Sequence, residues 1–203
     1  MKFVILAMSA LYLVLAAGIT TTPAQAQTLE DLYLFNRLVE PQNGYGPRSA
    51  LFRDQAGNLY GTTGYGGNLA CDNTGRGCGI IFKLDTSGNL TILHSFAGGA
   101  GGALPYAGLI RDAQGNLYGT TYGDDFGAGC TAPNGCGTVF KLDKAGNFTI
   151  LHQFQGTDGA SPSAGLIGTE RGIFTARPRA VETRTAVLPG AAELFSSSIR
   201  PAI

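Results

Sequence analysis

Charged residues are scarce in this chain, and tryptophan is absent. Only 14% of the 203 residues are charged, and 14 basic residues balance 14 acidic ones to a formal net charge of zero. Because nucleic-acid-binding proteins need a basic stripe to neutralise phosphates, and none appears here, we expect no nucleic-acid partner. The chain also shows no Ser–His–Asp order, no paired-carboxylate pattern and no phosphate-binding loop. The sequence therefore predicts no catalytic residue, no metal and no cofactor, and favours a protein that is not an enzyme.

Glycine, by contrast, is abundant, with 31 residues. No Gly-X-Y period accompanies it, so a collagen-like helix is excluded. The glycines lie between short apolar runs, a distribution typical of many tight turns.

The N-terminus has the pattern of a secretory signal peptide. A positive start at Met1-Lys2 precedes the apolar run Phe3–Ala17, and Ala24-Gln25-Ala26 is a small-residue cleavage site. We expect cleavage after residue 26, no membrane span in the mature chain, and an extracytoplasmic location: secreted, periplasmic or cell-surface. An uncleaved membrane anchor is the alternative, although a spanning helix needs about 20 apolar residues.

The four cysteines form two close pairs, Cys71 with Cys78 and Cys130 with Cys136. An exported protein meets an oxidising compartment, so the spacing predicts one small disulfide loop per pair. The alternative, a zinc site, needs four converging ligands. The two histidines of the chain fall inside predicted strands far from the cysteines, which favours disulfides.

A period of 58 residues dominates the rest of the sequence. Arg53–Thr63 and Arg111–Thr121 share nine of eleven residues, and Cys78–Phe96 and Cys136–Phe154 share thirteen of nineteen. Repeats of this length are units that bury their apolar faces by stacking on their neighbours.

Each unit divides into two predicted hairpins. In the second unit, short strands at Ala107–Asp112, Leu117–Thr121, Thr138–Asp143 and Phe148–Phe154 are separated by turns. The turns share the pattern Asp-x-x-Gly-Asn, in which glycine suits a left-handed backbone position and the Asp side chain can bond the turn. Four strands in about 58 residues match one blade of a β-propeller, so we predict an all-β, β-propeller-like fold of about two blades with an irregular C-terminal tail.

The period also extends towards the N-terminus. Leu34, Asn36 and Leu38 align with Ile92, His94 and Phe96, so Leu32–Leu38 is predicted to be the last strand of a preceding unit. The predicted organisation is a signal peptide at 1–26, this strand with a linker and a first strand at 27–52, repeat 1 at 49–106, repeat 2 at 107–163, the start of a third repeat at 164–167 and the tail at 168–203.

These motifs resemble the Gloeobacter/Verrucomicrobia-type tandem repeat, called GloVer, of exported bacterial proteins. The resemblance rests on GNLYGTT at Gly57–Thr63 and Gly115–Thr121, and on the run Val139–Phe154 with its counterpart Ile81–Phe96. It implies an extracytoplasmic multi-repeat protein, often with a C-terminal anchoring signal and with no established activity. This chain departs from that pattern because it is short and shows no such anchor.

The third unit begins on schedule but loses its motif after Ile167. Ile173–Pro178 can be encoded ATC TTT ACG GCA CGA CC; with an A before it, the shifted frame AAT CTT TAC GGC ACG ACC encodes Asn-Leu-Tyr-Gly-Thr-Thr. The third bases are free choices, but the first two bases of every codon fit. Our hypothesis is that residues 168–203 are translated out of frame; an ordinary divergent extension is the alternative.

Few residues are candidates for a site. Asp124 and Asp125 have the oxygen ligands that calcium prefers, but a solvated loop is the favoured interpretation. The repeat-equivalent His94 and His152 are expected to be hydrogen-bonding strand residues, and Tyr60 and Tyr118 to be packing residues. The loop-edge aromatics, which could stack on a sugar or a partner but are expected mainly to fill space between units, are Tyr65, Tyr106 and Tyr122.

The sequence thus favours an exported repeat scaffold with a binding, surface or structural role and an unknown extracellular partner. One alternative is a fragment of a secreted propeller enzyme of the lyase or hydrolase type. Another is a nonfunctional frameshifted product, whose open strand edges would favour self-association.

Overall fold

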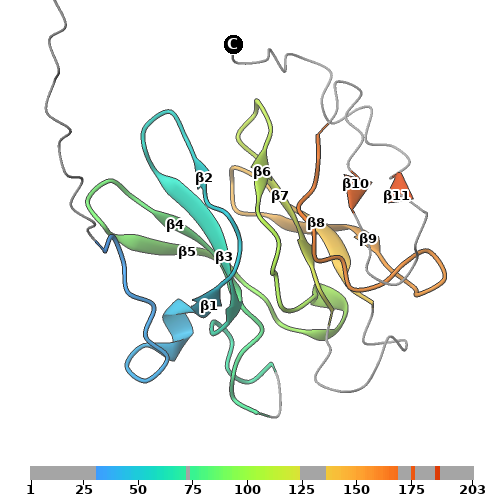
Figure 1. Cartoon of the computed structure of the whole chain (residues 1–203), viewed down its shortest axis with the longest axis horizontal. Coiled ribbons are helices and arrows are strands. Elements are labelled where there is room, and N and C mark those ends of the chain that lie inside the picture. Colours follow the sequence, from blue (N-terminus) through green and yellow to red (C-terminus); the bar gives the residue numbers. More distant parts are fainter. Residues whose placement is uncertain (1–30, 72–73, 124–135, 169–174, 177–185, 188–203) are drawn as a thin grey trace, which may run out of the picture. The chain divides into compact units, whose positions relative to one another are not determined.

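The computed structural model describes residues 31–71, 74–123, 136–168, 175–176 and 186–187. The fold is all-β: antiparallel sheets are accompanied by two single-turn 3-10 helices, η1 (Pro41–Asn43) and η2 (Gly99–Gly101). Two larger sheets, one from each repeat, follow each other along the chain (Figure 1). The all-β prediction is therefore confirmed.

The two sheets have the same strand order. The first contains β2 (Phe52–Arg53), β3 (Leu59–Tyr65), β4 (Ile80–Leu84) and β5 (Leu90–Ser95), with β1 (Tyr45–Pro47) paired to the far end of β3. The second contains β6 (Ile110–Arg111), β7 (Leu117–Thr121), β8 (Thr138–Leu142) and β9 (Phe148–Gln153).

The registers of the two sheets also coincide. Tyr60 is paired with Lys83 in the first sheet, as Tyr118 is with Lys141 in the second. Both sheets carry an irregularity at the same place, immediately before Phe82 and immediately before Phe140. Because a slip of one residue would send every side chain to the opposite face, this agreement means that equivalent side chains occupy equivalent places.

The Asp-x-x-Gly-Asn turns have the predicted chemistry. Asp112 accepts hydrogen bonds from the Asn116 backbone N–H at 2.8 Å and from the Asn116 amide at 2.7 Å, and the Gly115 N–H bonds the Asp112 carbonyl. Gly115 has φ = +92°, a conformation that glycine adopts without strain. The same bonds recur in the turns at Asp54, Asp85 and Asp143.

The largest core lies between the two sheets. It joins Ile81 and Phe96 of the first sheet to Phe140 and Leu142 of the second, and Leu104 of the connecting linker is buried among them. The rings of Phe96 and Phe140 meet edge to face with centroids 5.4 Å apart. Neither sheet buries this face alone, as expected of a stacked repeat.

The far faces of the two sheets are covered by neighbouring segments. In the first sheet, Phe35 packs on Phe82 with ring centroids 5.1 Å apart, and Tyr33 joins it. In the second, Ala160 and Leu166 of the segment after β9 pack around Tyr118, Val139 and Phe154.

The prediction of a strand at Leu32–Leu38 is wrong, because this segment has a bend at Leu32, no regular secondary structure at 33–36 and a turn that begins at Arg37. Its inward aromatics do cover the first sheet, but Leu34 and Leu38 are exposed, at 75% and 92%. A strand is defined by its hydrogen-bonded partner, and the backbone of this segment pairs with none of the described strands. Burial of Tyr33 and Phe35 alone does not impose the extended ladder.

Within the predicted tail, β10 (Thr175–Ala176) and β11 (Ala186–Val187) form an antiparallel pair. The tail is therefore not wholly irregular, and its other residues from 169 onward lie outside the described part. Across the residues that the structure describes, no helix has the length and apolar character needed to cross a membrane.

Candidate functional site

The first predicted disulfide is confirmed. Cys71 and Cys78 are bonded, with Cα atoms 6.0 Å apart, and the bond closes the glycine-rich loop between β3 and β4. These two sulfurs are therefore not available as thiolate ligands for zinc. The second bridge, between Cys130 and Cys136, stays a prediction because Cys130 lies outside the described residues.

The two histidines differ from the prediction and from each other. The ring of His94 stacks on Phe148 of the next unit, with centroids 3.9 Å apart and planes inclined by 6°. Burial lowers the pKa of His94, and its imidazole has no hydrogen-bond partner among the described residues, so its predicted hydrogen-bonding role is wrong. His152 does have that role, since its Nε2 lies 2.8 Å from the Asp158 carboxylate.

The two tyrosines of the repeated motif, Tyr60 and Tyr118, are packing residues, as predicted, and are also hydrogen-bonded. Tyr118 is fully buried and its hydroxyl donates to Asp112 at 2.9 Å; Tyr60 is partly exposed and donates to Asp54 at 3.2 Å. Asp124 and Asp125 lie outside the described residues, so their assignment to a solvated loop stays a prediction. Within the described ranges, no three His, Cys, Asp or Glu side chains converge as a metal site would require.

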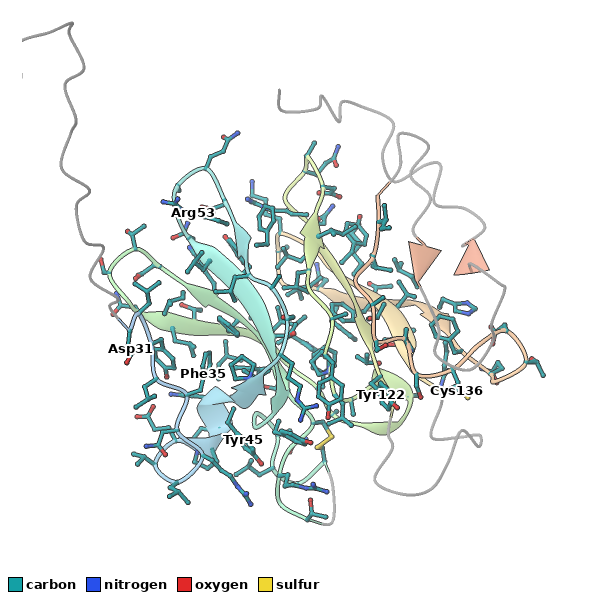
Figure 2. The ribbon with its side chains drawn as sticks, viewed as in Figure 1. Asp31, Phe35, Tyr45, Arg53, Tyr122 and Cys136 are labelled. Atoms are coloured by element: carbon teal, nitrogen blue, oxygen red, sulfur yellow. A yellow bond between two sulfur atoms is a disulfide. The ribbon has the colours of Figure 1, made fainter. Side chains whose placement is uncertain are left out.

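The loop-edge tyrosines come together in a row that crosses both units. Tyr45 stacks on Tyr65 with centroids 5.3 Å apart, Tyr65 meets Tyr106 at 6.5 Å, and Tyr106 meets Tyr122 at 5.7 Å. The Tyr106 hydroxyl donates to the Tyr65 hydroxyl at 3.2 Å. All four rings are partly exposed. Figure 2 shows Tyr45 and Tyr122 at the same edge of the molecule, opposite Arg53.

Arginine side chains lie over these rings. The Arg48 guanidinium carbon is 4.8 Å from the centroid of Tyr106, and that of Arg76 is 5.7 Å from the centroid of Tyr65. Both distances are within the range of cation–π attraction. We call this set, Tyr45, Arg48, Tyr65, Arg76, Tyr106 and Tyr122, the tyrosine–arginine surface.

The phenol at the middle of this surface keeps its proton. Burial raises the pKa of Tyr106, and the hydrogen bond with Tyr65 raises it further. At neutral pH the hydroxyl is therefore a donor and acceptor of hydrogen bonds and not a base. The chemistry available at this surface is stacking, hydrogen bonding and attraction of anions.

The surface is built from positions at which the two repeats differ. At a spacing of 58 residues, Arg48 corresponds to Tyr106, Gly64 to Tyr122 and Tyr65 to Gly123. The first repeat has glycine at position 64, where the second has Tyr122, for a steric reason: a Cβ at Gly64 would collide with the Tyr106 ring. Each unit thus contributes different aromatic groups to a shared edge.

Sequence reasoning identified Tyr65, Tyr106 and Tyr122 as loop-edge aromatics but did not bring them together, and it missed Tyr45, Arg48 and Arg76. A usable signal was present in the repeat itself. Comparison of the two units separates the positions that build the sheet, most of which are identical, from the loop-edge positions, which differ. The missed residues Tyr45 and Arg48 are at positions where the repeats differ, because the corresponding residues 58 positions later are Ala103 and Tyr106.

Comparison with known proteins identifies the family. A family model described as the Gloeobacter/Verrucomicrobia repeat matches residues 18–180, and the chain belongs to this family. No curated protein matches the chain.

One similar solved structure is a structural-genomics target described as a candidate gluconolactonase. It is 15% identical with a TM-score of 0.40, and the match covers 70% of this chain and 44% of that one. The chain thus spans less than half of that protein, and a likeness of this size carries no argument about function.

Proposed function

We propose that this chain is an exported scaffold of β-propeller-type blades, one blade per repeat of about 58 residues, that binds an acidic extracellular saccharide at its tyrosine–arginine surface. The role is binding and not catalysis. The two sheets, with their shared strand order and register, support the blade as the repeating unit.

The observation that carries the proposal is the row of four partly exposed tyrosines, with Arg48 and Arg76 over two of the rings and Arg37 5.5 Å from the ring centroid of a third, Tyr45. Aromatic rings offer an apolar face and a polar hydroxyl, which suits a sugar with its C–H faces and hydroxyl groups. Guanidinium groups pair with carboxylates through two parallel N–H···O bonds. Together these groups favour a saccharide that carries carboxylates over a neutral one.

The location of these residues supports the same proposal. Loops on a rigid repeat scaffold are where binding residues are usually presented. Tyr45 is the first residue of β1 and Tyr106 lies in the linker before β6, while Tyr65 and Tyr122 lie where β3 and β7 end. The Cys71–Cys78 disulfide, in the loop that follows β3, is compatible with an oxidising, extracytoplasmic location.

Isothermal titration with oligogalacturonate, neutral oligosaccharides and single-stranded DNA of equal charge tests the proposal. Wild-type protein should bind oligogalacturonate, and Tyr106→Ala should weaken that binding about tenfold because a stacking face is lost. Tyr106→Phe, which keeps the ring, should retain most of the affinity.

Two further variants control for folding. Arg48 is exposed, so Arg48→Gln should leave the fold intact while weakening the acidic ligand selectively. Lys83→Gln removes a cation from β4, which does not contribute to the surface, and should have no effect. Equal binding of neutral and acidic sugars, or tighter binding of DNA, would contradict the proposal.

A further inference from the structure

A pocket of about 560 Å³ opens between the two sheets at the edge opposite the tyrosine–arginine surface. Its walls are the turn between β2 and β3 and the turn between β6 and β7, and Lys144 of the β8–β9 turn completes it. Figure 2 shows Arg53, which lines this pocket, at one edge, and Tyr45 and Tyr122 at the other. Strand β3, seven residues long, runs between the two edges, so they are about 20 Å apart.

The pocket has three cations. Arg53, Arg111 and Lys144 are all exposed and line it, together with the exposed amide Gln114. Neither Arg53 nor Lys144 has a carboxylate within 4.0 Å in the described part of the chain, and Arg111 has only a long ion pair, with Nη1 3.9 Å from Asp54. These cations are therefore available to an incoming anion.

The two carboxylates that line the pocket, Asp54 and Asp112, already accept hydrogen bonds within their own turns and sheets. Asp54 accepts from the Asn58 backbone and amide, both at 2.9 Å, and from Tyr60 at 3.2 Å. Asp112 accepts the equivalent three bonds, at 2.8, 2.7 and 2.9 Å. Since both are largely buried, with Asp54 9% exposed as a side chain and Asp112 7% exposed, they oppose an anion less than their charge alone implies.

The geometry of the cations is set by rigid elements. Arg53 and Arg111 each precede the Asp of a tightly bonded turn, so the backbone that carries them is fixed. Arg111 is held further, because its Nε donates to the Gly115 carbonyl at 3.4 Å and its guanidinium lies 5.7 Å from the centroid of Tyr60. Arg111 is therefore partly preorganised, and it loses less side-chain entropy than a free arginine when a ligand binds.

We propose that this pocket is a second binding site, for the carboxylate or sulfate group of an extracellular saccharide. Arg53 and Lys144 hold the anionic group, with Arg111 as the third cation, and the amides of Gln55 and Gln114 bind the neighbouring hydroxyl groups. The pocket volume is in the range of small-ligand sites and exceeds that of an inorganic ion. Because the two sites lie at opposite edges, one molecule can hold two saccharide chains.

Calorimetry on the full chain tests this site separately from the tyrosine–arginine surface. The probes are trigalacturonate, a sulfated disaccharide, inorganic sulfate and neutral maltotriose. Arg53→Gln and Lys144→Gln, alone and combined, should each weaken the acidic saccharides about tenfold or more at the pocket, as expected when a charge-assisted bond is lost. Raising the salt concentration should also weaken the binding of acidic saccharides at the pocket, because salt screens the attraction between opposite charges.

Stoichiometry then distinguishes the two sites. The wild type should bind two equivalents of the acidic saccharide, whereas the Arg53→Gln/Lys144→Gln variant and Tyr106→Ala should each keep one equivalent at wild-type affinity and bind the other at least about tenfold more weakly. The relative affinities for the carboxylated and sulfated probes identify which anionic group the pocket takes. A Lys83→Gln control, outside the pocket, should match the wild type.

The proposed pocket site is refuted if the double variant binds every acidic probe with wild-type stoichiometry and affinity, or if inorganic sulfate binds as tightly as both saccharides. If Tyr106→Ala has no effect while the pocket variants bind one equivalent more weakly, the tyrosine–arginine surface fails and the pocket stands.

Discussion

The paired turns offer a test of how burial sets the strength of one hydrogen bond. Tyr118→Phe and Tyr60→Phe remove the same hydroxyl from the same position of two repeats. Tyr118 is fully buried and its partner Asp112 is 7% exposed. Tyr60 is partly exposed, and its bond to Asp54 is longer, at 3.2 Å against 2.9 Å. The two variants therefore differ mainly in environment.

The expected loss in free energy of unfolding depends on the hydrogen bonds that each aspartate keeps after its tyrosine is replaced. Without the Tyr118 hydroxyl, Asp112 keeps two side-chain hydrogen bonds among the described residues, both from Asn116, and the position of the lost hydroxyl is fully buried, which disfavours replacement by water. A lost bond to a charged, buried acceptor costs about 1.5–3 kcal/mol, and phenylalanine leaves no large cavity to add to it. At the other turn the bond is longer and the tyrosine itself is partly exposed, so water can reach the position of the lost hydroxyl and Tyr60→Phe should cost less than half as much.

Urea unfolding, followed by circular dichroism, measures the difference. For a urea dependence of about 2 kcal/mol per molar, a loss of about 2 kcal/mol lowers the midpoint by about 1 M. Tyr118→Phe should show this shift with an unchanged slope, and Tyr60→Phe a much smaller one. Equal shifts in the two variants would refute the reasoning, because burial would then not decide the strength of the bond.

Three other changes test the packing. Replacing Cys71 and Cys78 by serine should lower the free energy of unfolding by about 2.5 kcal/mol, the loop entropy of a short disulfide loop. Reduction of the wild type should lower the urea midpoint by at least as much, because it also breaks the predicted Cys130–Cys136 bridge; a smaller shift would contradict the loop model. Burial lowers the pKa of His94 in the folded chain, so the unfolded chain binds a proton at this imidazole more tightly. The contribution of neutral His94 to stability should be complete above pH 6.5 and should fall as the pH drops below that value. Urea midpoints at several pH values should show this fall, and His94→Phe should reduce it. Gly64→Ala should destabilise the chain by about 1–3 kcal/mol because the new methyl group collides with the Tyr106 ring; Tyr106→Ala in the same chain should restore part of the loss in thermal unfolding.

The sequence was sufficient for those parts of the fold that depend on local chemistry. Strand β7 coincides with the predicted Leu117–Thr121, and the turns form as their Asp, Gly and Asn residues require. The strand predicted at Leu32–Leu38 failed because a strand also needs a partner with free backbone groups, which periodicity alone does not supply. In the structure Tyr33 and Phe35 of this segment pack on the first sheet, a contact that the periodicity did not predict.

The candidate sites were harder to predict because they arise between units. Tyr65 and Tyr106 are 41 residues apart, and their contact depends on how the sheets stack. The pocket likewise requires the turns of Arg53 and Arg111 to face a shared space, which identical motifs do not reveal. A repeated motif indicates what each unit does for its own fold and says little about the space between two copies.

The repeat does, however, contain its own control for function. Each position of one unit can be compared with a position of the other that has the same backbone and register. Where the two residues are the same and make the same hydrogen bond within their own units, as Tyr60 and Tyr118 do, a structural role explains both. Where they differ but lie together, as Arg48 and Tyr106 do at 4.8 Å, folding of the unit does not require either residue. The tyrosine–arginine surface consists largely of such differing positions, so its composition was free to follow a ligand.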